Sequence, residues 1–250
     1  MVTFVCKNRK IRCMETMYDT LLQLPLFQGL CHEDFTNILG KVKLHFTTYK
    51  IGETIVKPDM VCDRLVFLLK GEISSYSSPK GKYFTFIEHF EAPYVIEAYS
   101  LFGMNLNYTS SYVARTEAQT ISVSKSFVLT ELFNYDIFRL NYMNIISNRA
   151  QIFYDRVWRS ASETIEEKII DFILARTEKF TGEKDLKIRM EDIGAYVDGT
   201  RLNVSKALND LQALGLFILS RKAIHIPEIS TLVQWSEAQR NSKKKKVEKL

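Results

Sequence analysis

The chain has 250 residues, of which 46% are hydrophobic and 25% charged, and its formal net charge is +5. These values are typical of a soluble globular protein with enough apolar material for two cores, so neither disulfides nor a structural metal is needed for folding. No apolar run reaches the ~18 residues of a membrane span, and the first residues lack the apolar centre of a signal peptide. We therefore expect a cytoplasmic protein with no membrane partner.

The first half of the chain predicts short helices followed by many strands. Between residues 14 and 40, leucines are interrupted by Pro25 and Gly29, which is typical of short amphipathic helices. From Val42 to Val128, short apolar runs alternate with glycine and proline turns, a pattern that predicts an antiparallel β-barrel or jelly roll. The plainest strands read LVFLLKGEISSYS, KYFTFIEHF, YVIEAYSLF and SYVARTEAQTISVS. We expect an α+β protein in which residues 14–128 form the first domain.

A long helix is predicted from about Asp136 to Arg159, within a segment of residues 129–161. Five apolar residues follow the 3-4-3-4 spacing of a coiled-coil seam, namely Met143, Ile146, Ala150, Phe153 and Val157. A second apolar stripe lies beside them, at Phe138, Tyr142, Ile145 and Ile152. Two stripes need two covering surfaces, so we expect one to pack on the barrel and the seam to pack on a second copy. The alternative is a helix buried inside a monomer.

Residues 162–230 predict a winged helix-turn-helix. A short helix from Glu191 to Val197 is followed by Asp198-Gly199, two residues that suit a tight turn. Thr200 can cap a second helix, whose apolar face comprises Val204, Ala207, Leu208 and Leu211. Two strands, Phe217–Ser220 and Ala223–Ile226, can pair across Arg221-Lys222. Such a motif places one helix in the DNA major groove, although similar helix pairs also occur in proteins that bind no DNA. Residues 231–250 are expected to form a basic tail, frayed from about residue 240.

The order of barrel, seam helix and winged helix-turn-helix resembles the Crp/Fnr family of bacterial transcription regulators, from about Leu24 to Glu228. Two motifs carry the resemblance, YKIGETIVKPDMVCDRLVFLLKGEI in the barrel and IGAYVDGTRLNVSKAL in the recognition region. The family usually has glycine where this chain has Pro58. The resemblance implies a homodimer that binds double-stranded palindromic DNA and RNA polymerase, under the control of a small-molecule effector in the barrel.

The resemblance also implies roles for the outer face of the second helix. Arg201 and Lys206 fall on positions that read bases in the family, and arginine suits the paired acceptors of guanine. Leu202 replaces the usual glutamate, so it can contact a thymine methyl group but cannot accept from cytosine. The candidates for phosphate contacts are Thr200, Asn203 and Ser205.

The effector is where the chain departs from the family. Members that bind a cyclic nucleotide have a Gly-Glu followed by an Arg-Ser, with the glutamate on the ribose and the arginine on the phosphate. Here Ala98 aligns with the glutamate and Thr109 with the arginine. Glu97 lies one residue early, and a slip of one residue on a strand turns a side chain to the other face. We therefore expect no cyclic nucleotide, and an effector site of Phe86, Glu97, Tyr99, Thr109 and Ser110.

Other cofactors and activities stay open or are disfavoured by the sequence. The aromatic surroundings allow a hydrophobic or haem effector. The chain has four cysteines, Cys6, Cys13, Cys31 and Cys62. Their spacings match neither a zinc site nor the family's iron–sulfur cluster, so we expect ordinary thiols. An iron–sulfur or redox role is the alternative. No motif of a hydrolase, nucleotide-binding enzyme or metalloenzyme appears, so we expect no enzymatic activity. The competing function is an effector-binding or protein-interaction module that has lost DNA specificity, which Leu202 favours.

Overall fold

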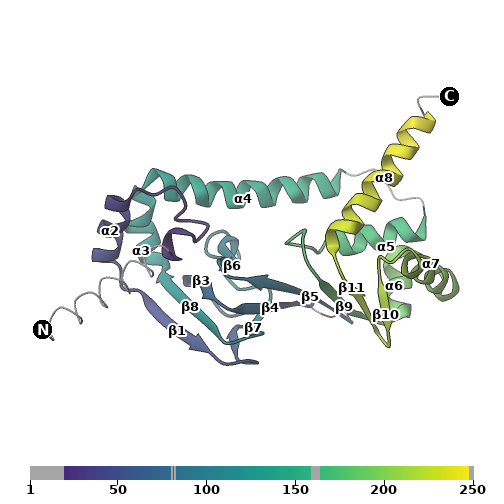
Figure 1. Ribbon diagram of the computed structural model, residues 1–250, viewed down its shortest axis with the longest axis horizontal. Coiled ribbons are helices and arrows are strands. Elements are labelled where there is room, and N and C mark those ends of the chain that lie inside the picture. The colour runs from purple at the N-terminus through teal and green to yellow at the C-terminus, as the bar shows by residue number, and fades with distance from the viewer. Residues whose placement is uncertain (1–19, 80, 82, 159–163, 248–250) are drawn as a thin grey trace, which may run out of the picture. The chain divides into compact units, whose positions relative to one another are not determined.

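The computed structural model describes residues 20–79, 81, 83–158 and 164–247, and the chain divides into two compact units (Figure 1). Unit 1 runs through Ile73 and continues from Phe90 to Ile152. Unit 2 comprises Ser74–His89 and the chain from Phe153 onward. Each unit has a hydrophobic core of its own.

Unit 1 is built mainly from antiparallel strands. One sheet has the order β1-β8-β3-β6, with the bounds His45–Tyr49, Ala118–Ser124, Arg64–Lys70 and Tyr94–Ile96. A second pair consists of β2 (Thr54–Val56) and β7 (Ser111–Ala114), which are also antiparallel. The predicted antiparallel class is confirmed. The expected strand YVIEAYSLF is shorter than predicted, since β6 ends at Ile96 and a 3₁₀ helix, η1 (Ala98–Ser100), follows.

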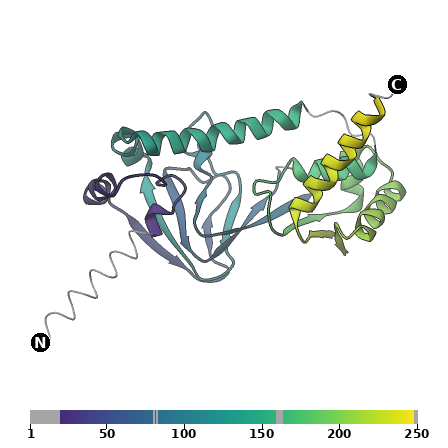
Figure 2. The ribbon, with the colours of Figure 1, turned by 45° about the horizontal axis from the view of Figure 1, so that its top comes forward.

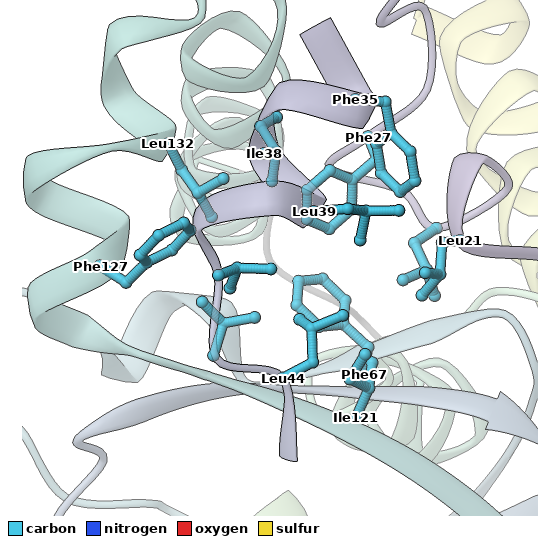
Figure 3. Close-up of a pocket in the computed structure, with 13 residues that line it drawn as sticks. Leu21, Phe27, Phe35, Ile38, Leu39, Leu44, Phe67, Ile121, Phe127 and Leu132 are labelled. Atoms are coloured by element: carbon cyan, nitrogen blue, oxygen red, sulfur yellow. The ribbon is translucent and has the colours of Figure 1, made fainter. Parts of the chain in front are cut away.

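Helices and aromatic rings fill one end of unit 1. The helical elements there are α2 (His32–Lys41), α3 (Lys125–Thr130), η2 (Leu132–Asn134) and α4 (Asp136–Val157). The Phe27 ring lies between those of Phe35, Phe67 and Phe138, with ring centres 5.3 to 5.6 Å apart. Figure 3 shows apolar side chains of α2, α3 and η2 converging with those of strands β3 and β8 on one small space. That space is about 10 Å³, room for about one water molecule, so this is packed core rather than a ligand pocket.

The long helix α4 has two opposite apolar faces. Phe138 and Tyr142 are buried in the core of unit 1, and the Tyr142 hydroxyl donates to the Ala98 carbonyl oxygen at 2.6 Å. The expectation that one stripe packs on the chain's own strands is therefore confirmed. Four of the five predicted seam residues are exposed, whereas Ile146 is half-buried because it packs partly against the same core.

The exposed apolar seam of α4 is offset slightly from the predicted one. Met143, Ala150, Phe153 and Val157 are exposed, as are Leu140, Tyr154 and Trp158 outside the predicted set. Residues 140, 143, 147, 150, 154 and 157 keep the 3-4 spacing and lie opposite the buried stripe. The exposed seam is accordingly centred on Leu140, Met143, Ala150, Tyr154 and Val157.

Unit 2 contains an antiparallel sheet with the order β10-β11-β9-β5-β4. The bounds are Ile218–Ser220, Ala223–Ile226, Lys184–Ile188, Phe84–Glu91 and Glu72–Ser77. Strand β5 pairs with β9, from Phe84 opposite Ile188 to Glu88 opposite Lys184. The sequence placed residues 74–89 in the first domain, but this pairing makes them part of unit 2. Phe86 is 1% exposed in the core of unit 2, so its assignment to the effector site is wrong.

The described part of unit 2 also contains the helices α5 (Ile165–Leu174), α6 (Met190–Val197), α7 (Arg201–Ala213) and α8 (Ile229–Val247). Helix α5 begins with a capping box between Thr164 and Glu167, which satisfies two backbone N–H groups at its start. Figure 2 shows α8 in yellow beside the green helices of unit 2. Instead of an unstructured basic tail, α8 is a helix whose first turn is fixed by fully buried Ile229 and Leu232. The helices in the described part of the chain include none with the length and hydrophobicity that a membrane span requires.

Candidate DNA-binding site and effector region

The turn between α6 and α7 depends on two glycines. Helix α6 ends at Val197, and the capping residue Asp198 has a left-handed φ of 54°. The N–H of Gly199 then donates to the carbonyl oxygen of Gly194 at 3.0 Å. A Cβ atom on Gly194 would lie 2.7 Å from the Gly199 oxygen, closer than real side chains come. Glycine at position 194 therefore sets how closely the turn approaches α6.

Helix α7 has one buried and one open face. The Thr200 hydroxyl accepts from the N–H of Asn203 at 3.3 Å, which is the predicted cap. The predicted apolar face is confirmed, since its members are at most 2% exposed: Val204, Ala207, Leu208 and Leu211. The six predicted DNA-contacting residues lie on the other side, all exposed except half-buried Ser205: Thr200, Arg201, Leu202, Asn203, Ser205 and Lys206.

The polar contacts on this face are weak. The Arg201 guanidinium lies 3.5 Å from a Glu191 carboxylate oxygen, and both side chains are largely exposed. An exposed pair of this kind contributes only about 0–1 kcal/mol, so Arg201 can exchange it for a ligand. The hairpin of β10 and β11 turns at Arg221 and Lys222, and Lys222 has a left-handed φ of 62°. Both of these turn residues are exposed.

Glu97 is the centre of the predicted effector region in unit 1. Its carboxylate is 1% exposed and accepts four hydrogen bonds. One oxygen accepts from the Thr109 N–H and the Ser100 hydroxyl, both at 2.8 Å. The other accepts from the Ser110 N–H and the Thr109 hydroxyl, both at 2.9 Å. The structure thus brings Glu97, Thr109 and Ser110 together, and Tyr99 joins them through a 3.3 Å contact between its hydroxyl and that of Thr109.

The expectation that Glu97 faces away from this cluster is wrong. Strand alternation does not apply to Glu97, because β6 ends one residue earlier. Glu97 has a left-handed φ of 38°, which turns its side chain toward Thr109 and Ser110. Arg115 is the arginine nearest to Thr109 along the sequence, and its guanidinium lies 3.5 Å from a Glu72 carboxylate oxygen. A cation does lie beside the cluster, since the Arg149 guanidinium stacks 3.6 Å from the centre of the Tyr99 ring.

The cysteines of the described chain have local structural roles. Cys31 caps α2 by accepting from the Asp34 N–H. Cys62 is buried, its thiol donates to the Arg64 carbonyl oxygen at 3.6 Å, and burial raises its pKa. Cys6 and Cys13 lie outside the described residues. Within residues 20–247, apart from the gaps, no three His, Cys, Asp or Glu side chains are grouped as a metal site.

A buried ion pair links β5 to β9 in unit 2. Glu88 is 3% exposed and Lys184 fully buried, with 3.7 Å between carboxylate and ammonium. The Glu88 carboxylate also accepts from the N–H groups of Glu178 and Lys179. Burial raises the pKa of Glu88 to about 7, although the charge of Lys184 acts to lower it. Burial also lowers the pKa of Lys184. Both shifts favour the neutral forms.

This pair predicts a pH-dependent stability. Between the ordinary glutamate pKa of 4.5 and about 7, the folded chain holds a proton on Glu88 that the unfolded chain has lost. Its contribution to the free energy of unfolding is therefore full at lower pH and is lost as pH rises through about 7, up to about 3 kcal/mol in total. Urea unfolding at about pH 5 and pH 8 should show this loss in the wild type and a smaller one in Glu88→Gln. Equal losses in the two proteins would contradict the assignment.

No protein-family model matches this chain, and no curated protein matches it in sequence. Several solved structures, however, are similar to this chain. The catabolite activator protein of Thermus thermophilus is 15% identical with a TM-score of 0.44, over 86% of this chain and 99% of the other. A CRP/FNR-family regulator from the same organism is 17% identical with a TM-score of 0.45, over 77% and 98%. The c-di-GMP-responsive regulator CLP of Xanthomonas campestris is 12% identical with a TM-score of 0.45, over 79% and 99%. Transcription regulators of the Crp/Fnr family thus stand among the solved structures to which this chain is similar.

Proposed function

We propose that this protein is a transcription regulator that binds DNA as a homodimer, with α6 and α7 as a helix-turn-helix and the β10–β11 hairpin as its wing. The observation that carries the proposal is the two-sided character of α7. Its inner face is buried, and its outer face exposes Arg201, Asn203 and Lys206 directly after a tight turn. A helix held in this way can enter a major groove with its N-terminal residues on base edges.

In this proposal the exposed seam of α4 pairs with its copy, and the two α7 helices reach successive major grooves of a palindromic site. The DNA-binding domain that we propose, residues 162–230, lies within unit 2, and unit 1 is a jelly-roll sensing domain. By resemblance to the Crp/Fnr family, RNA polymerase is the further partner. The protein is a regulator and has no catalytic role.

The effector we propose is not a cyclic nucleotide. A buried phosphate needs hydrogen-bond donors and a positive partner. In unit 1 the N–H groups of Thr109 and Ser110 already donate to the Glu97 carboxylate, which would also repel a phosphate. A hydrophobic molecule or haem is the alternative that the aromatic residues of unit 1 favour. Its contact residues would include Tyr99, next to the Glu97 cluster.

Arg201→Ala tests the DNA-binding proposal. The change should cost about 1–3 kcal/mol in affinity and relax preference at one base pair in each half-site, because a bidentate base contact is lost. Lys206→Ala should weaken binding through either a base or a phosphate. The measurement is the affinity of the full chain for variants of a duplex selected from a random library. Arg115→Ala, an exposed arginine of unit 1, is the matched control and should leave binding unchanged.

If Arg201→Ala binds every duplex as the wild type does, α7 is not the reading helix. The second candidate function, a protein-interaction module, would then be favoured by Leu202, which is 78% exposed on that face.

A further inference from the structure

Unit 2 has a cationic groove whose lining does not include α7. Its volume is about 340 Å³, and it runs between the tip of the β4–β5 hairpin, strand β9 and the wing turn. The polar residues that line it are Ser78, Tyr83, Thr85, Lys187, Arg189 and Lys222. We call this surface the hairpin groove.

The pairing of β5 with β9 builds the hairpin groove. Phe86 and Leu186 are opposite each other and buried, so the neighbouring pair of Thr85 and Lys187 points to the other side of the sheet. Lys187 is also opposite Ala223, the first residue of β11 after the wing turn. Strands β5, β9 and β11 lie side by side in Figure 1. A segment that the sequence assigns to the sensing domain therefore lies next to the wing.

The hairpin groove is continuous with the helix-turn-helix. A second cleft of about 250 Å³ is lined by Arg201 of α7 and Ser220 of the wing, and it shares Arg189 and Lys222 with the hairpin groove. Cationic side chains thus follow one another from the start of α7 to the hairpin. The acidic residues beside them are Glu191 and Asp192.

The cations in the groove differ in freedom. The Arg189 guanidinium is held by the Asp192 carboxylate at 2.8 and 3.2 Å and lies 4.8 Å from the centre of the Tyr83 ring. Lys187 and Lys222 are exposed, and neither forms an ion pair with a residue that the structure describes. The ammonium groups of Lys187 and Lys222 are therefore available to an anionic partner.

We propose that the hairpin groove binds the DNA backbone beyond the bases that α7 reads, so that the β4–β5 hairpin forms part of the DNA interface. Lys187 and Lys222 each neutralise a phosphate, while the Tyr83 hydroxyl offers a hydrogen bond to a phosphate or sugar oxygen. The Ser78 and Thr85 hydroxyls lie 2.9 Å apart and bond to each other, which leaves one of their two protons for the DNA. The partner is a nucleic-acid backbone rather than a small anion, because the cations are spread along an open surface that begins at α7 instead of converging on one point. This inference rests on the proposed function, because the hairpin groove would contact the same DNA duplex that α7 binds.

The salt dependence of DNA binding tests this inference. Each phosphate neutralised by the protein contributes about 0.9 to the slope of log affinity against log salt. The full chain carrying Lys187→Gln and Lys222→Gln should lose about 1.8 from that slope and keep the wild-type base preference. The probe is the duplex selected from the random library, followed by fluorescence anisotropy at several salt concentrations. Lys43→Gln with Lys57→Gln, two exposed lysines of unit 1, should keep the wild-type slope.

A charge-preserving variant separates charge from folding. Lys187→Arg with Lys222→Arg should restore the slope, and a slope that stays low would overturn the inference. An unchanged slope in the glutamine variant, with Arg201→Ala still losing base preference, would overturn the inference and leave the proposed function standing. A wild-type chain that binds no duplex would overturn both.

Discussion

The variant Met143→Asp is expected to be monomeric at micromolar concentration, whereas the wild type should be a dimer. Met143 is 50% exposed on the apolar seam of α4, opposite the face that packs on unit 1. In a two-fold dimer the same residue is lost from both copies. Because burying such a side chain contributes about 1.5–3 kcal/mol, the pair accounts for about 3–6 kcal/mol. Two new carboxylates would face the interface as well, and burying an unpaired charge adds a further cost.

Light scattering coupled to gel filtration measures this directly. Asn148→Asp is the matched control, because Asn148 is exposed on the same helix but its position in the helical repeat lies away from the seam. It should remain dimeric. A monomeric wild type, or a Met143→Asp protein that stays dimeric, would show that the seam has another purpose. The unfolding transition of Met143→Asp should match that of the wild-type chain diluted to its monomer, since the residue is not part of either core.

The variant Glu97→Ala is expected to lose on the order of 3–5 kcal/mol in the free energy of unfolding. The change removes the acceptor of two backbone N–H groups, on Thr109 and Ser110, and of the hydroxyls of Ser100 and Thr109. A buried donor left without a partner costs about 1–3 kcal/mol. The stability of Glu97→Gln should lie between those of the wild type and Glu97→Ala, because its amide supplies one acceptor oxygen but turns an NH₂ group toward donors.

Urea unfolding with Glu53→Ala as the control separates burial from hydrogen bonding. The Glu53 carboxylate also accepts from a backbone N–H, that of Lys50 at 2.8 Å, but it is exposed. Its loss should therefore change stability by at most about 1 kcal/mol. Similar losses in the two alanine variants would mean that the Glu97 cluster is not what holds the segment from Ala98 to Ser110.

Calorimetry on the wild type tests the same cluster for ligand binding. We expect no low-micromolar affinity for cyclic AMP or cyclic GMP, because the donors for a phosphate are already satisfied by Glu97. A low-micromolar affinity would show that the carboxylate moves aside and that the interpretation of this cluster is wrong.

Features of the fold that repeat every few residues could be predicted from the sequence. The spacing of Val204, Leu208 and Leu211 fixed which face of α7 is buried, and Asp198-Gly199 fixed its turn. Alternating apolar runs predicted antiparallel strands, and the two stripes of α4 predicted a helix with one face on its own core. Such patterns report local backbone geometry, which neighbouring residues decide among themselves. The open face of α7, with Arg201 and Lys206, followed from the same logic.

Contacts between segments that are distant in the sequence could be seen only in the folded chain. The pairing of β5 with β9 joins residues about a hundred positions apart, so no local pattern indicates that Phe86 packs in unit 2 or that Lys187 lies beside Thr85. The direction of Glu97 depended on where β6 ends and on donors that come from residues 12 and 13 positions later. A strand presents the same alternation to any partner, and its neighbour is chosen by the packing of the whole chain.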